Sequence, residues 1–163
     1  MSSSSSPTSP ILPQSGIFKV LDDEHRGLLA SAGKLRLLAP GAVLMEQGEP
    51  QASLFFVIEG VLNVTVHSPM STVAMGTIKA GETVGEMNVL DPLKASATVK
   101  VQHTARVWEI SRDELEKFVD LHPKAGVAIL TELAVLLTRR IRRIADKMIR
   151  QAEMAVAAYE IDS

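Results

Sequence analysis

The residues with the clearest chemical potential lie in one stretch, GETVGEMNVLDPLKASATVKV, from Gly81 to Val101. Its glycines precede a short apolar segment that we expect to form a helix. Backbone N–H groups at the start of such a helix can point toward an anion, and glycine lets the backbone approach closely. This stretch, called the cassette below, is therefore expected to hold a phosphate-like anion. Its candidate ligand-binding residues are Gly85, Glu86, Met87, Asn88, Lys94, Ser96 and Ala97.

Short apolar runs, separated by turn residues, surround the cassette and must position it. One of them, from Val61 to Ser68, alternates in the period of a strand, whereas the SLFFVIE run before Gly60 is mostly apolar. This spacing predicts a mainly β fold with flanking helices, in which a jelly-roll barrel or sandwich is followed by a long C-terminal helix. Trp108, the only tryptophan, is expected to fill the core or the junction with the helices.

Helical patterns flank the expected strands on both sides. Near the N-terminus, DDEHRGLLASAG predicts a short helix that Asp22 or Asp23 caps and Gly33 ends. After the last strand, Ser111 and Glu114 have the spacing of a capping box. Pro123 suits the first turn of the final helix. The expected organisation is a disordered Ser/Pro-rich tail at 1–15, a β-roll with flanking helices at 16–122 and a long helix at 123–159.

The final helix carries apolar residues at a and d spacing over about four heptads, which favours a coiled-coil seam. We therefore expect a homodimer; the alternative is a long helix that packs wholly on its own domain. The RRIRR cluster at 139–143 flanks this seam and is expected to form a solvated rim, with binding to phosphates or to an acidic protein as the alternative. The predicted dimerisation residues are Leu130, Leu137, Ile141, Ile144 and Met148.

Composition excludes several classes of function. The chain has no cysteine, which rules out a disulfide scaffold, a thiolate metal site and a thiol nucleophile, and suits a cytoplasmic location. Its four histidines do not cluster, no catalytic motif is evident and no apolar run approaches the roughly 18 residues of a membrane span. We expect neither an enzyme nor a metal site. The net charge of −2 is unevenly distributed, because segment 124–150 carries +5 and the remainder −7.

Three motifs together resemble the cyclic-nucleotide-binding domain family, over about Ile17 to Arg143: PGAVLMEQGE, LFFVIEGVLNV and GETVGEMNVLDPLKASATV. This family includes the sensor domains of catabolite-activator-type regulators and of the regulatory subunit of the cyclic-AMP-dependent kinase. The resemblance implies that Glu86 accepts the ribose hydroxyl and that Ser96 and Ala97 contact the phosphate. It also implies cyclic AMP or cyclic GMP as candidate ligands.

The cassette departs from the family pattern at its main positive charge. Ala95 stands where the family has an arginine that forks onto the phosphate. Lys94 could offer a flexible point charge but not a planar fork. Loss of such a contact costs about 2–5 kcal/mol of binding free energy. Asn88 replaces a smaller residue, and its side chain is expected to crowd the ligand or to bond the cassette amides itself.

The leading hypothesis is a non-catalytic regulatory or scaffolding protein with a degenerate cyclic-nucleotide-binding domain, which dimerises through its C-terminal helix and acts through a protein partner. In this version the site is empty or filled by Asn88 and Lys94. The alternative is a genuine cyclic-AMP or cyclic-GMP sensor with an atypical cassette. A third reading has the tail and the basic helix reach other subunits. No resident cofactor is expected. The sequence ends at Ser163, so we expect no helix-turn-helix reader and no sequence-specific DNA binding.

Overall fold

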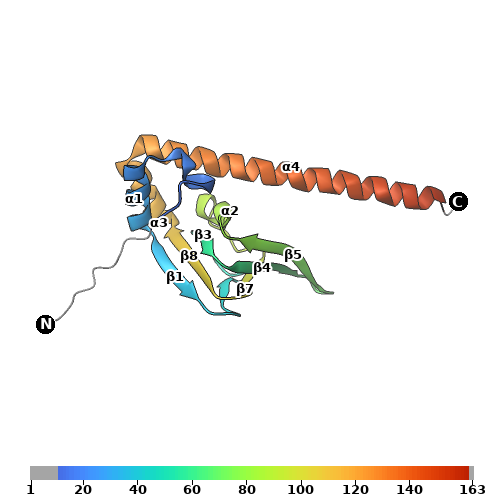
Figure 1. Ribbon diagram of the computed structural model, residues 1–163. Helices are drawn as coiled ribbons and strands as arrows, with labels where there is room; N and C mark the ends of the chain where they lie inside the picture. The colour runs from blue at the N-terminus through green and yellow to red at the C-terminus, as the bar shows by residue number, and fades with distance from the viewer. Residues whose placement is uncertain (1–10, 162–163) are drawn as a thin grey trace.

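The computed structural model describes residues 11–161 as a β-roll, with helices gathered at one end and one long helix that runs past the roll (Figure 1). Two four-stranded antiparallel sheets, in the orders β1-β8-β3-β6 and β2-β7-β4-β5, form the roll. The strands are β1 (Lys34–Leu38), β2 (Val43–Met45), β3 (Ser53–Glu59), β4 (Val61–His67), β5 (Thr72–Lys79), β6 (Thr83–Val84), β7 (Thr98–Val101) and β8 (Ala105–Ser111). The helices are the 3-10 helix η1 (Gly16–Val20), α1 (Asp23–Ala32), α2 (Glu86–Leu90), α3 (Arg112–Leu121) and α4 (Pro123–Ile161). The predicted fold class is confirmed.

Strand β3 is apolar on both faces because each face covers a different core. Successive side chains of a strand point to opposite sides of the sheet. Leu54 and Phe56 therefore pack under the helices, whereas Phe55 and Val57 pack between the two sheets. This two-sided burial explains why the sequence of β3 does not alternate between apolar and polar residues.

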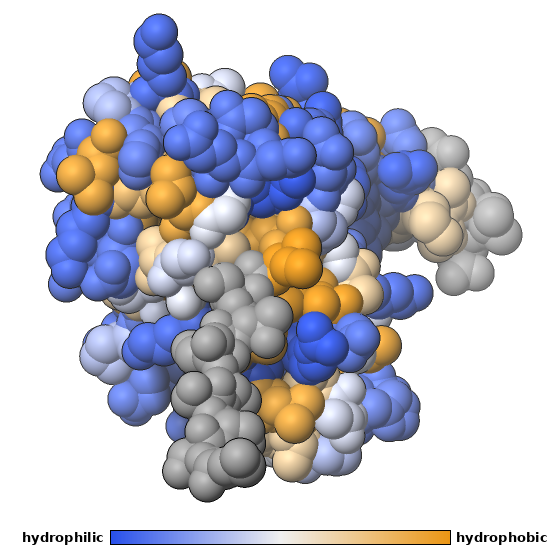
Figure 2. All heavy atoms as spheres, turned by 60° about the vertical axis from the view of Figure 1, so that its left-hand side comes forward, coloured by the Kyte–Doolittle hydropathy of each residue, from blue (hydrophilic) through white to orange (hydrophobic). Residues whose placement is uncertain are grey.

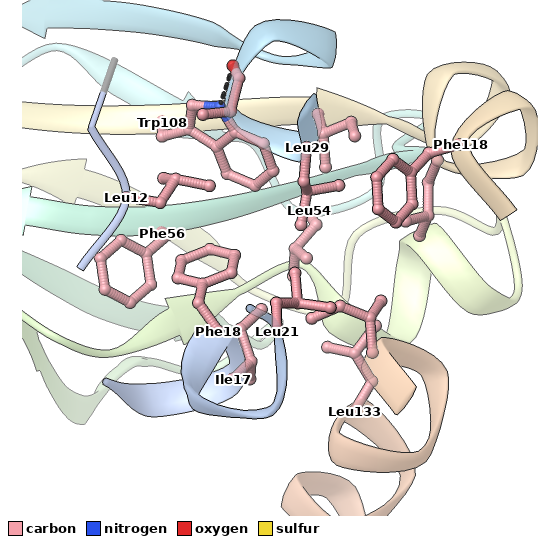
Figure 3. Packing of buried hydrophobic residues seen from close by; sticks show 14 of the residues in the cluster. Leu12, Ile17, Phe18, Leu21, Leu29, Leu54, Phe56, Trp108, Phe118 and Leu133 are labelled. Atoms are coloured by element: carbon pink, nitrogen blue, oxygen red, sulfur yellow. Dashed lines mark hydrogen bonds between the residues drawn. The ribbon is translucent and has the colours of Figure 1, made fainter. Parts of the chain in front are cut away.

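The core under the helices is built around Trp108 (Figure 3). This side chain is fully buried, and its indole N–H donates to the carbonyl oxygen of Ala30 in α1 at 3.1 Å. The ring of Phe18, from η1, meets Phe56 and Trp108 edge-on, with centroids 4.8 and 5.5 Å away. Aromatic pairs prefer this geometry over a face-to-face stack. The expected place of Trp108 in the core is confirmed.

One residue of the predicted N-terminal tail belongs to the fold. Leu12 is only 2% exposed and packs in the core cluster under the helices. The prediction that 1–15 stays outside the fold is therefore wrong at Leu12. Leu12 joins the core because full burial of a leucine side chain removes apolar surface from water and stabilises the fold by about 1.5–3 kcal/mol. Residues 1–10 lie outside the described part of the chain.

Side-chain caps start two of the helices where the sequence predicts them. The Asp22 carboxylate accepts a hydrogen bond from the backbone N–H of His25 at 2.8 Å, at the start of α1. The Ser111 hydroxyl accepts one from the backbone N–H of Glu114 at 3.3 Å, at the start of α3. Each cap satisfies a backbone donor that the first helical turn leaves free.

Figure 2 views the end of the molecule that carries α1 and the N-terminus. Hydrophilic side chains cover most of this face, and hydrophobic atoms reach the surface in patches among them. Apolar atoms are a normal part of a folded surface. At this end, the apolar side chains that matter most for the fold are those beneath the helices.

Helix α4 has a packed first half and an exposed second half. Ala125, Ile129 and Leu133 are buried against the domain, whereas every residue from Ile141 to Tyr159 is exposed. At 1.5 Å per residue, this exposed part extends for about 28 Å. No helix within residues 11–161 has the length and apolar content that a membrane crossing requires.

Candidate ligand-binding site

A cavity of about 1030 Å³ lies between the cassette, the β4–β5 hairpin and α4, and is called the ligand cavity below. We call its cassette residues the floor, and its residues from the hairpin and from α4 the two walls. Most of the predicted site residues meet there. Those that line the cavity are Gly85, Glu86, Met87, Asn88, Ser96 and Ala97.

Lys94 is the one predicted site residue that does not line the cavity. Lys94 is exposed, and its backbone forms an isolated antiparallel β-bridge with Pro50. The side chain of the next residue, Ala95, is buried in the core between the two sheets and is only 3% exposed. Neighbouring residues of an extended chain point to opposite sides. With Ala95 turned inward, Lys94 is turned out, so the prediction for Lys94 does not hold in this structure.

Three interactions hold helix α2 at the cavity floor. Gly85 has a φ of +84°, and a Cβ there would lie 2.3 Å from the carbonyl oxygen of Ser53. Asn88 donates from its side-chain amide to the carbonyl oxygen of Leu93 at 3.1 Å, which closes the turn after α2. Arg112, in α3, donates to the last carbonyl of α2 at 2.5 Å. The Asn88 side chain thus supports the cassette from within.

The positive charge at the cassette comes from α4. Glu86 is only 2% exposed, and its carboxylate forms an ion pair with the guanidinium of Arg140. Arg140 also donates to the carbonyl oxygen of Thr83 at 2.8 Å. A solvated rim was expected for the arginine cluster, and that expectation is wrong for Arg140. The sequence does hold a signal, because Arg140 stands seven residues, two helical turns, after the buried Leu133 and so continues the packed face.

The surroundings of Arg140 disfavour its positive charge. Burial, and then the nearby cation of Arg143, lower the pKa of Arg140 below its ordinary value, while Glu82 acts in the opposite direction. An arginine nevertheless keeps its proton in proteins. The charged guanidinium is therefore held where a further anion would stabilise it.

Two buried oxygen atoms at the cavity have no hydrogen-bond partner within residues 11–161. They are Oε2 of Glu86 and Oγ1 of Thr83. Buried polar atoms in folded proteins almost always have a partner. Both residues line the cavity, so these two unpaired oxygens lie close to the space that a ligand would occupy.

The fold is a jelly roll whose cassette faces the long helix α4 across the ligand cavity. Residues 35–122 match the cyclic nucleotide-binding domain family, and the chain belongs to this family. The fold of this family supports a regulatory or sensor role.

Several known proteins are similar to this chain. Glutaminase 1 of Bradyrhizobium diazoefficiens is 29% identical over 130 residues, which cover 80% of this chain and 21% of that protein. The chain spans about one fifth of the length of this relative and of glutaminase 2 from the same organism. A cyclic nucleotide-binding domain from Methylobacillus flagellatus KT has a TM-score of 0.76 at 26% identity, over 80% of this chain and 74% of that one. The catabolite activator protein of Thermus thermophilus, with a TM-score of 0.75 at 24% identity over 85% and 63%, shows the fold alone.

Proposed function

We propose that the chain is a non-catalytic regulatory module that binds a small anionic nucleotide in the ligand cavity and reports binding through α4. The observation that carries this proposal is the ion pair of Arg140 with Glu86, since it ties α4 directly to the cassette. A ligand that contacts either residue changes the link between the two elements.

The contents of the cavity favour the sensor version over the self-filled version. Asn88 directs its side-chain amide N–H to the carbonyl oxygen of Leu93, and Lys94 does not line the cavity. Neither side chain replaces a ligand, and about 1030 Å³ remain between the cassette and α4. The free oxygens on Glu86 and Thr83 also favour a polar ligand.

In the proposed mechanism Arg140 supplies the charge that Ala95 cannot. The ligand's phosphate contacts the guanidinium of Arg140, and a ribose hydroxyl donates to the carboxylate of Glu86. Such a ligand binds one arrangement of α4 better than another, and the population of that arrangement rises. The size of the response is limited by the difference between the two affinities.

Isothermal calorimetry with cyclic AMP and cyclic GMP tests this function. We expect binding by the unmodified chain, and we expect Arg140→Gln to weaken it by at least about tenfold, because a partly buried charge contact is lost. Arg142→Gln is the matched control, since Arg142 does not line the cavity. Silence of the unmodified chain up to millimolar ligand would overturn the proposal.

A second candidate function is assembly, and the exposed half of α4 supports it. Ile141, Ile144 and Met148 are 67%, 60% and 64% exposed. Leu137 is half-buried, and Leu130 packs partly on the domain's own core. These two residues, at the N-terminal end of the predicted seam, are therefore less available for dimerisation than the sequence predicts. The homodimer, the protein partner, the cytoplasmic location and the lack of sequence-specific DNA binding stay predictions.

A further inference from the structure

The ligand cavity holds more positive charge than one phosphate needs. Its lining contains five cations against three carboxylates, a net charge of +2. Two of the cations are already paired, Arg140 with Glu86 and Lys19 with Glu132 at 3.3 Å. The remaining cations, Arg139, Arg143 and Lys147, face one remaining carboxylate, that of Glu82.

Two of these cations extend the charge of Arg140 along one face of α4. Arg143 and Lys147 follow Arg140 at three and seven residues and line the same cavity. Like charges at such spacing destabilise a helix. At 1.5 Å per residue, the row from Arg140 to Lys147 spans about 10 Å. A single phosphate at Arg140 leaves the far end of this row without a counter-charge.

The cavity is also large and has an apolar wall opposite these cations. Ligand pockets typically measure about 300–1,000 Å³, and this one measures about 1030 Å³. Val64, Val66 and Met75 make the hairpin wall apolar, and Met148 adds an apolar side chain from α4 itself. Methionine adapts its shape and makes favourable contacts with aromatic rings. This wall suits the flat faces of nucleobases.

We propose that the preferred ligand carries two phosphodiester groups and two bases, as a cyclic dinucleotide does. One phosphate lies at Arg140 beside the cassette, the other contacts Arg143 and Lys147, and a base packs on the hairpin wall. This inference rests on the proposed function and narrows its ligand class from an anionic nucleotide to a dinucleotide.

Calorimetry with cyclic di-AMP and cyclic di-GMP, next to cyclic AMP, cyclic GMP and ADP, tests the inference. We expect one cyclic dinucleotide to bind at least about tenfold more tightly than either mononucleotide, because a second charge-assisted contact is made. The double variant Arg143→Gln/Lys147→Gln should lower dinucleotide affinity by about tenfold or more and mononucleotide affinity by a clearly smaller factor, because only the dinucleotide loses a direct contact. Arg142→Gln/Arg150→Gln removes the same charge from positions outside the cavity lining and should change neither affinity by more than about twofold.

Each other outcome counts against the inference in a distinct way. Mononucleotides that bind as tightly as dinucleotides would overturn it and leave the proposed function intact. If ADP binds as tightly as the dinucleotides, two phosphates are enough for the tighter binding, and the second base has no part in it. An equal loss of dinucleotide affinity in the control variant Arg142→Gln/Arg150→Gln would show that the overall positive charge of α4, and not a contact with Arg143 and Lys147, causes the effect. No binding by any ligand would overturn both this inference and the proposed function.

Discussion

At the scale of single residues, the site depends on one carboxylate and one guanidinium from distant parts of the chain. Glu86 is buried at the cavity floor, and Arg140 reaches it from α4. A buried charge that loses its partner keeps its desolvation cost without the compensating attraction. The pair should therefore matter for stability as well as for binding.

Arg140→Gln should lower the free energy of unfolding by about 1–3 kcal/mol, less than for a fully buried pair because Arg140 is one-third exposed. Glu86→Gln in the same chain should recover part of the loss, since no buried charge is then left alone. Urea unfolding of both single variants and the double variant measures the coupling. An unfolding midpoint of Arg140→Gln equal to that of the unmodified chain would show that the pair contributes nothing.

At the scale of elements, helix α2 and strand β3 are in such close contact that only glycine fits between them. Gly85 has a positive φ, and a Cβ at this position would clash with the backbone carbonyl oxygen of Ser53. The helix start and the cavity floor therefore share one backbone position that a side chain would disturb.

Gly85→Ala should destabilise the chain by about 1–3 kcal/mol, because both the backbone conformation and the contact with Ser53 become strained. Gly27→Ala is the matched control. Gly27 is exposed in α1, and no atom lies within 4 Å of the place that an alanine methyl group would take, so its substitution should add about 0.5–1 kcal/mol of stability. Thermal unfolding compares the two, and equal shifts in the same direction would contradict the proposed contact.

The cap of α1 predicts a specific dependence on pH. The backbone N–H of His25, and then its side chain, hydrogen-bond the Asp22 carboxylate and lower its pKa below the ordinary value. A lowered pKa contributes stability that is present above the unfolded value, about 3.9, and lost as the pH falls through the folded value. Asp22→Asn keeps an acceptor but does not titrate, so its urea midpoint should fall less steeply than that of the unmodified chain below about pH 4. Parallel pH profiles of the two proteins would rule out this role for Asp22.

At the scale of the whole molecule, α4 joins a packed domain to a long exposed arm (Figure 1). The arm exposes Ile141, Ile144 and Met148 at the predicted seam spacing. Ile144 and Met148 also line the ligand cavity, so the same stretch of α4 meets both the cavity and the exposed seam. Ligand binding and assembly would then compete or cooperate on one helix.

Ile141→Lys should abolish dimerisation and leave the domain folded, because Ile141 lies on the exposed arm and does not line the cavity. Ala157→Lys, on the same arm but outside the a and d positions, is the control for added charge. Sedimentation equilibrium measures the mass of each variant, and circular dichroism checks the fold. A monomeric unmodified chain would remove the assembly function, and a dimeric Ile141→Lys variant would place the interface elsewhere.

The sequence alone was enough to predict the jelly roll, a cap at Asp22 or Asp23, the cap at Ser111, the start of α4 and the position of the cassette. These features depend on periodicity and on hydrogen bonds between residues a few positions apart, which a sequence displays directly. Most of the cassette's predicted site residues do meet at one cavity for the same reason, since they lie in one short segment.

Only the tertiary structure decided where the charges and the apolar faces point. Arg140 meets Glu86, Lys94 turns away and Leu12 joins the core because separate elements pack against each other in particular orientations. The periodicity of α4 predicts an apolar stripe but not which part of it the domain covers. A side chain's role across such distances follows from packing, and local sequence carries only a weak trace of it, as the two-turn spacing of Leu133 and Arg140 illustrates.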